Sequence, residues 1–261
     1  MQPASLFLGH GSPMILIEPS PTRSFLADLS ERIDRPDAIL MVSAHWQAER
    51  PSLTFTARPE TIHDFGGFPP ELYRATYPAP GSPELAERVA DLLGEQGLKA
   101  DLHPERGFDH GAWIPLALAW PAAKIPVVQL SLIADKDAAA HMALGRFLRP
   151  LAGENVLVIG SGNLTHNLRE AMAWMQRGAG DAAWAHDFAH EMTEAVLAGD
   201  EKALAEWHSR MPDAARAHPS VEHLLPLFVA FGAGGGKARL MHDAWELGSL
   251  SMAAFSFDPA D

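Results

Sequence analysis

The sequence has no cysteine among its 261 residues. Disulfide bridges, thiolate metal sites and a cysteine nucleophile are therefore excluded. Any metal must be held by histidine and carboxylate groups, which suit iron, zinc, nickel or manganese. Basic residues are also few, because 20 Lys and Arg against 33 Asp and Glu give a formal net charge of −13. Such a surface repels phosphates and anionic headgroups, so we expect neither nucleic acid nor a membrane as a partner.

Long hydrophobic runs are absent as well. Apolar stretches such as Trp113–Pro121 are too short, and too broken by proline, to span a bilayer. The first residues lack the basic start of a signal peptide and lead into a strand-like segment. We therefore expect a cytoplasmic protein, and its 47% hydrophobic residues are enough for a sizeable core.

Four short, continuous apolar runs rich in β-branched residues predict buried strands. They are Ser5–Gly9, Ala38–Ala44, Ile125–Leu132 and Asn155–Gly160. Helices are predicted at Pro83–Gln96, Asp137–Leu151, Asp181–Leu197 and Ser220–Phe231. Strands that alternate with helices predict an α/β fold, with a mostly parallel central sheet covered by helices on both faces. We expect one catalytic domain over residues 1–261, and interpret the Gly-rich stretch Ala233–Gly236 as a plain connecting turn.

One long segment, Thr61–Ser82, does not fit the alternation of strands and helices. It is rich in proline and glycine and carries four aromatic side chains, those of Phe65, Phe68, Tyr73 and Tyr77. A loop of this length in a compact domain is usually functional or disordered, and the aromatic content argues against disorder.

Histidine is the compositional excess, with 13 residues in the chain. His10 and His45 each follow a predicted strand directly, and His166 follows another after a few residues. Ligands bind outside the carboxyl ends of parallel strands, so these three side chains are expected to face one crevice. Glycines on both sides of His10 and before His166 would allow the backbone to approach a ligand closely.

Two further positions are less clear from the pattern alone. His110 lies beside Asp109 in a segment that follows no clear strand. Ser220 is expected to cap a helix that has Glu222 and His223 in its first turn. Adjacent helical residues point about 100° apart, so only one of the two can face a given metal. Plain capping, with Glu222 favourable near the helix start, is the alternative.

Other candidates are weaker. His186 and His190 have the spacing of a zinc-protease helix, but Asp187 stands where that motif requires Glu. Ser12 and Ser161 are possible nucleophiles, yet neither lies in a GxSxG elbow.

Several strings together resemble a known family. LGHGSPM, VSAHW, HDFGGFPPELY, GFDHGAW, PVVQLSL, SGNLTHNL and PSVEHLLPL occur in this order. They resemble the class III extradiol ring-cleaving dioxygenases, and most nearly those of the DOPA 4,5-dioxygenase type. The resemblance runs from residue 6 to the GSLSM segment at 248–252, which is nearly the whole chain.

The resemblance implies a non-haem Fe(II) enzyme that uses O2 to open a catechol ring beside its two hydroxyls. It implies His10 and His45 as metal ligands and a third ligand in the PSVEH segment, His223, with Glu222 as the alternative. His166 would act as the acid/base residue and approach the metal as a further ligand. His110 would line the substrate site and take part in catalysis.

Elementary chemistry agrees with this implication. Three protein ligands on one face of a metal leave room for both a catechol and O2. With His223 in place of a carboxylate, the site has one negative charge less, so we expect Zn(II) to be tolerated there too. Phe65, Phe68 and Tyr73, with Tyr77, would cover an aromatic substrate.

Two other functions compete with this interpretation. The same histidines would serve a zinc hydrolase that activates water. The third hypothesis is a non-enzymatic metal-binding module, like the Memo-type proteins. The sequence leaves open which catechol is used and what the oligomeric state is.

Overall fold

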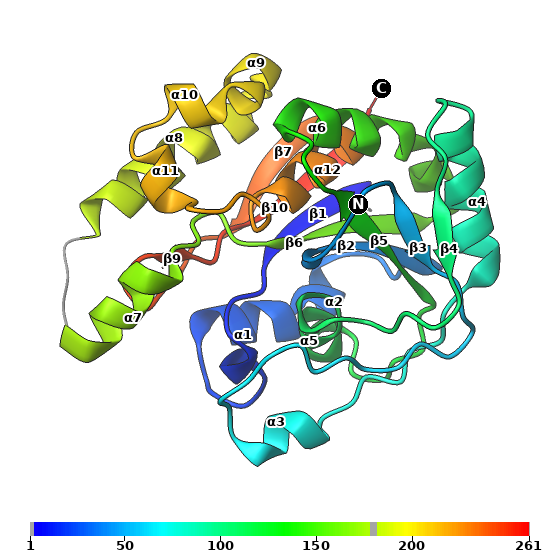
Figure 1. Cartoon of the computed structure of the whole chain (residues 1–261), viewed down its shortest axis with the longest axis horizontal. Helices are drawn as coiled ribbons and strands as arrows, with labels where there is room; N and C mark the ends of the chain where they lie inside the picture. Colours follow the sequence, from blue (N-terminus) through cyan, green and yellow to red (C-terminus); the bar gives the residue numbers. More distant parts are fainter. Residues whose placement is uncertain (1–2, 178–181, 261) are drawn as a thin grey trace.

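The computed structural model describes residues 3–177 and 182–260 (Figure 1). A central eight-stranded sheet has the order β4-β3-β5-β2-β6-β1-β10-β7, and β8 pairs with β9 in a small hairpin. The strands are β1 Ser5–Gly9, β2 Ala38–Ala48, β3 Ser52–Thr54, β4 Asp101–His103, β5 Val127–Ile133, β6 Val156–Gly162, β7 Gly235–His242, β8 Trp245–Glu246, β9 Leu250–Ser251 and β10 Ala254–Pro259.

The four predicted strands form the centre of this sheet. They are β5, β2, β6 and β1, which pair in parallel in that order. The edge strands were not predicted: β3 pairs with β5, and β10 with both β1 and β7, in antiparallel fashion. β3 and β4 are only three residues long, and β7 is largely exposed, so none of them gives a continuous apolar run. The predicted α/β fold with a mostly parallel sheet is confirmed.

Helices cover both faces of the sheet, as predicted (Figure 1). Leu6 and Leu8 of β1 pack with α1, α2 and α5, whereas Phe7 packs with α4, α6, α8 and α12 on the opposite face. Successive side chains of a strand point to opposite faces, so a strand apolar at every position is buried on both. These helices are α1 Pro21–Ala27, α2 Leu29–Arg32, α4 Pro83–Gly94, α5 His110–Ala119, α6 Ala138–Phe147, α8 Ala183–Ala198 and α12 Leu225–Gly234.

The smaller helices lie in the connections. They are η1 Pro13–Leu16, α3 Pro70–Arg74, η2 Arg149–Glu154, α7 Leu168–Arg177, α9 Glu201–Ala205, α10 Trp207–Arg210 and α11 Ala214–Ala217. α3 lies inside the segment Thr61–Ser82, which was expected to be all loop. No helix in the described ranges is both long and apolar enough to cross a bilayer.

Local chemistry explains where the predicted helices begin and end. The Ser82 hydroxyl accepts from the Leu85 N–H, 3.1 Å away, and caps α4 as predicted. α6 ends at Phe147 rather than Leu151, because a separate 3₁₀ turn begins at Arg149 with Pro150 as its second residue. Asp181, the predicted start of the next helix, lies outside the described residues, and α8 is described from Ala183.

Two expectations near α12 were wrong. This helix begins at Leu225, with Pro226 in its first turn, and not at Ser220. The Ser220 hydroxyl donates to Glu222, 2.9 Å away, instead of capping, so Glu222 and His223 lie in the preceding turn. Ala233–Gly236 is not a plain connector either. The helix continues to Gly234, ends at Gly235 with a φ of 78° that favours glycine, and passes directly into β7.

Candidate metal centre

Strand ends place the first members of a histidine cluster. His10 follows β1, and His166 follows β6, its parallel neighbour. His45 was expected just past β2 but lies within that strand. The pairing of β2 with β5 is irregular between Val42 and Gln47, so the residues between them bulge out of the ladder. A bulge redirects side chains, and this one lies near the carboxyl end of β2, where β1 and β6 also end.

Backbone hydrogen bonds join three segments of the chain at this edge. The His10 N–H donates to the Gly162 carbonyl at 3.0 Å, and the Asn163 N–H donates to the His223 carbonyl at 2.9 Å. The His166 N–H donates to the Ala217 carbonyl at 2.9 Å. The turn before α12 is thereby fixed beside the loop after β6.

Five imidazoles come together here. The His10 and His45 ring centroids are 5.1 Å apart. His223 lies 5.5 Å from His10 and 4.9 Å from His45, and His110 lies 5.6 and 4.0 Å from the same two rings. His166 stacks on His223 with centroids 3.5 Å apart. Donor atoms of His10, His45 and His110 all lie within 4.8 Å of one another, as do those of His166, Glu222 and His223.

The tautomer of His10 follows from its hydrogen bonds. Ser161 donates its only hydroxyl proton to the Gly111 carbonyl at 2.5 Å. The Ser161 oxygen therefore accepts from Nδ1–H of His10, which is 3.0 Å away. Nε2 of His10 is then left unprotonated, with its lone pair toward the cluster.

Nε2 of His10 lies 3.1 Å from Nε2 of His45. Two imidazole nitrogens bound to one divalent metal at about 2.1 Å are about 3.0 Å apart at a right angle and about 3.4 Å apart at a tetrahedral angle. The observed separation of 3.1 Å lies between these two values, and the lone pair of His10 Nε2 points into the gap. The pair of nitrogens therefore fits a bound metal ion.

Carboxylates lie at the Nδ1 atoms of three of the other rings, those of His45, His110 and His223. Nδ1 of His110 and Nδ1 of His45 lie 3.0 and 3.6 Å from the two oxygens of Asp64. Nδ1 of His223 lies 3.1 Å from Glu222. Metal-bound histidines generally turn their second nitrogen to an oxygen in this way.

Burial keeps four of the five imidazoles, those of His10, His45, His166 and His223, neutral. It lowers the pKa of His10 and of His223 well below the usual value, and the neighbouring histidines lower both further. The pKa of His45 falls to about 3, through burial and then through His110, and burial lowers the pKa of His166 to about 4. Burial alone would raise the pKa of Asp64, but its contacts with His110 lower it to about 2. His10, His45, His166 and His223 are therefore neutral nitrogen donors beside the Asp64 carboxylate anion at pH 7, the state that a cation requires.

Aromatic side chains of the segment Thr61–Ser82 lie beside this cluster. Phe65 meets His110 edge-on, with centroids 5.6 Å apart, and packs on Phe68 and Tyr73 at 5.5 and 5.2 Å. Tyr77, expected to belong to this cover, is instead buried in the body, where its hydroxyl donates to the Trp120 carbonyl at 3.2 Å.

Three residues of the site were not assigned to it from the sequence. Asp64 stands next to a histidine in HDFGGF, and Ser161 was weighed only as a nucleophile. Gly111 lies against the metal-site rings, since an added Cβ would come within 2.9 Å of His45 Cδ2 and 3.3 Å of His10 Cε1. Helix α5 was missed too, although Asp109 caps it, because the helix is apolar on every side and shows no periodicity.

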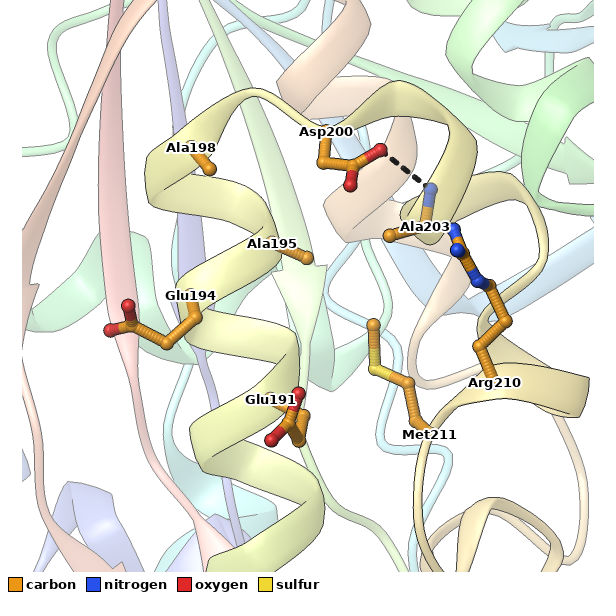
Figure 2. A pocket seen from close by; sticks show the side chains of 8 residues that line it. All are labelled: Glu191, Glu194, Ala195, Ala198, Asp200, Ala203, Arg210 and Met211. Atoms are coloured by element: carbon orange, nitrogen blue, oxygen red, sulfur yellow. Dashed lines mark hydrogen bonds between the residues drawn. The ribbon is translucent and has the colours of Figure 1, made fainter.

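Two of the other histidines make structural contacts away from the cluster. His141 is buried and bonds the backbone at the end of β5, and His186 packs on Trp245. A separate hollow of about 400 Å³ lies on α8, α9 and the turn after α10 (Figure 2). There Asp200 accepts from the Ala203 N–H at 2.9 Å, so this carboxylate caps α9 (Figure 2).

Comparisons with known proteins agree on one family. The family described as "Catalytic LigB subunit of aromatic ring-opening dioxygenase" matches residues 5–257. "4,5-DOPA dioxygenase extradiol" of Beta vulgaris is 42% identical over 259 residues, or 97% of this chain and 96% of the relative. The Escherichia coli K12 protein of that name is 40% identical over 95% of this chain and 92% of its own length. The crystal structure of an uncharacterized Escherichia coli K12 protein matches with a TM-score of 0.81 and 34% identity, over 98% of this chain and 100% of that one.

Proposed function

Because this chain belongs to the LigB family of aromatic ring-opening dioxygenases, and is thus a metal-dependent oxidoreductase that cleaves rings in the extradiol manner, we propose that it uses Fe(II) and O2 on a DOPA-like catechol. The family does not favour the two alternatives, a zinc hydrolase and a Memo-like binding module. The DOPA-like side chain is carried over from the names of the relatives.

The single observation that supports the metal most strongly is the pair of Nε2 atoms of His10 and His45, 3.1 Å apart. Ser161 fixes the His10 tautomer so that a lone pair points into this gap. We assign His10 and His45 as the first two ligands.

His223 is the proposed third ligand, with Glu222 as the alternative. Its ring contacts both His10 and His45, and its Nδ1 is turned to Glu222. His110 also contacts both rings, but it faces Phe65 and the aromatic segment. A flat substrate would lie on that side, so we assign His110 to substrate binding and catalysis.

A bound Fe(II) would supply open coordination positions for the two catechol oxygens and the redox change that O2 activation requires. The chain's own residues do the rest. His166 is neutral at pH 7 and can take a proton from a catechol hydroxyl at its imidazole nitrogen and return it later, besides approaching the metal as a further ligand. Phe65, Phe68 and Tyr73 provide apolar surface for the substrate ring and exclude water from it.

Nitrogen donors alone would also hold Zn(II), which has no accessible redox change, so zinc-loaded protein should be inactive. We propose a single catalytic domain over residues 1–261 in the cytoplasm, a compartment reducing enough to preserve Fe(II). The partners are the catechol and O2, with no role for nucleic acid or membrane.

The test is anaerobic reconstitution with Fe(II), followed by O2 and a panel of catechols that includes DOPA. We expect O2 uptake and a yellow ring-opened product in equal amounts, with no turnover by the Zn(II) form. Substituting His10 or His45 by Ala should abolish stoichiometric metal. Full metal occupancy in either variant would remove that residue from the ligand set, and absence of turnover on every catechol would contradict the proposed activity.

A further inference from the structure

Asp64 joins three parts of the site that are distant in the sequence. One carboxylate oxygen accepts from the backbone N–H of His110 at 2.8 Å, at the start of α5, and lies 3.0 Å from Nδ1 of the same residue. The other oxygen lies 3.6 Å from Nδ1 of His45, in the bulge of β2. Asp64 itself belongs to the aromatic segment Thr61–Ser82, which lies in the sequence between β2 and α5.

The His45 ring turns its outer nitrogen, Nδ1, toward this carboxylate. His10 is oriented by the Ser161 hydroxyl and His223 by Glu222, each through Nδ1. Among residues 3–177 and 182–260, Asp64 is the oxygen that lies at Nδ1 of His45. At 3.6 Å this contact is longer than a hydrogen bond, so it acts through the negative charge on the carboxylate rather than through a short bond.

The residues on either side of Asp64 contact the rest of the protein, so a shift of the carboxylate would also move these neighbours and their contacts. The Ile62 N–H donates to the Phe108 carbonyl at 2.8 Å, and the Ile62 carbonyl accepts from the Trp113 indole at 3.0 Å. On the other side, Phe65 meets the His110 ring and packs on Tyr73. The aromatic segment and the two imidazoles thus share one carboxylate as their polar connection.

We propose that Asp64 is a positioning residue that orients His45 and His110 for the metal and fastens the aromatic segment to the same centre. The inference rests on the proposed function, because it assumes that His45 is a ligand. It adds that metal binding and seating of the aromatic segment are linked through one side chain. Loss of an outer oxygen partner typically weakens metal binding about 10–100-fold.

The experiment measures Co(II) binding to the full chain without any turnover. Wild type, Asp64→Asn, Asp64→Glu and a charge-matched control, Asp101→Asn, are titrated anaerobically with Co(II), and the dissociation constant and visible spectrum are recorded. Asp101 pairs with Arg50 at 3.4 Å on β4, away from the cluster, so its variant removes the same charge elsewhere. Limited proteolysis of residues 61–82 is followed with and without Co(II).

We expect Asp64→Asn to bind Co(II) about 10–100-fold more weakly, with an altered spectrum, while Asp64→Glu recovers part of the affinity. Co(II) should protect residues 61–82 from cleavage in wild type and in Asp101→Asn, and much less in Asp64→Asn. Wild-type affinity and spectrum in a folded Asp64→Asn protein would overturn the inference and leave the metal centre intact. Wild-type protein that binds no Co(II) would overturn the metal centre itself, and this inference with it.

Discussion

The imidazole of His166 lies parallel to that of His223, with ring planes inclined by 6° and centroids 3.5 Å apart. The two rings are nevertheless held differently. Nδ1 of His223 lies 3.1 Å from Glu222 and its ring contacts His10 and His45, whereas His166 reaches the cluster through His223. Stacked neighbours of the same chemistry can therefore serve different steps, one as a ligand and one as a proton carrier.

Substituting these two residues separately should divide the two roles. His166→Ala should lose about 10²–10⁴-fold in turnover rate and keep most of its iron, because general base catalysis is worth that much. His223→Ala should lose the metal itself. Metal content and single-turnover rates on the same samples check this, and a parallel loss of iron and rate in His166→Ala would make His166 a further ligand.

Ser161→Ala should weaken metal binding without unfolding the protein. The hydroxyl accepts from Nδ1–H of His10, and without it that proton loses its partner and the ring its orientation. A loss of about 10–100-fold in metal affinity is expected. The matched control is Ser5→Ala, another buried strand serine, which donates to the Ala230 carbonyl at 2.6 Å. Equal metal affinities in the two variants would contradict the role of Ser161.

Gly111→Ala should also impair the metal centre, by crowding instead of by loss of a bond. The added methyl group would clash with the Ser43 hydroxyl and the His45 ring, which would have to shift, and it would lie tightly against His10, 3.3 Å from Cε1. Ala is a better helix former than Gly, so α5 should still form. In Gly94→Ala the methyl group meets open space within α4, so that variant should bind metal normally. Metal stoichiometry and melting temperature together distinguish the two, and full occupancy in Gly111→Ala would refute the prediction.

The centre of the fold was predictable because its strands are buried on both faces. Such strands are continuous apolar runs, and β1, β2, β5 and β6 were found from that signal. The edge strands are short or half-exposed, and their pairing is set by tertiary contacts that leave no local pattern. The start of α12 was misplaced because Ser220 has the chemistry of a cap but bonds Glu222 instead.

The residues of the site were likewise predictable only where a local pattern marks them. The histidines that follow strands were visible from the sequence, because parallel strands deliver their ends to one edge. The other three residues contact partners far away in the sequence. Asp64 contacts His110, 46 positions away, and Ser161 contacts His10, 151 positions away. The Gly111 carbonyl accepts from Ser161, 50 positions away. No spacing rule encodes such contacts. His45 was recognised, but its place within a bulge depends on the register between β2 and β5.

The aromatic side chains of the segment Thr61–Ser82, in contrast to its Asp64, should matter for the substrate and not for the metal. Phe65 and Phe68 pack on each other, and Phe65 contacts the ring of His110, which is assigned to the substrate and not to the metal. The double variant Phe65→Ala, Phe68→Ala should raise the KM for the catechol, or consume O2 without opening the ring, at unchanged iron content. Phe147→Ala, at a half-buried position of α6, is the control. Unchanged kinetics in the double variant would refute the idea that this segment covers the substrate.

The stability of the protein should fall in mild acid, and His141 should account for part of the loss. Its Nε2 accepts from the Ile133 N–H at 3.2 Å and its Nδ1 donates to the Asp137 carbonyl at 2.8 Å, so the neutral ring joins β5 to α6. Burial lowers its pKa, an effect only partly offset by Asp137. Below the unfolded pKa of about 6.5, the unfolded chain therefore binds a proton that the folded chain excludes.

This difference in proton binding lowers the free energy of unfolding as the pH falls. Stability due to neutral His141 is fully present above pH 6.5 and is lost as the pH falls from there toward the folded pKa, with a limiting slope of about 1.4 kcal/mol per pH unit. Gln can accept and donate at similar positions without titrating, so His141→Gln should flatten the dependence of the unfolding free energy on pH between about 6.5 and 5. The exposed His208→Gln should leave it as in wild type. Urea unfolding of the three proteins across this range is the measurement, and equal slopes in wild type and His141→Gln would show that His141 does not carry the effect.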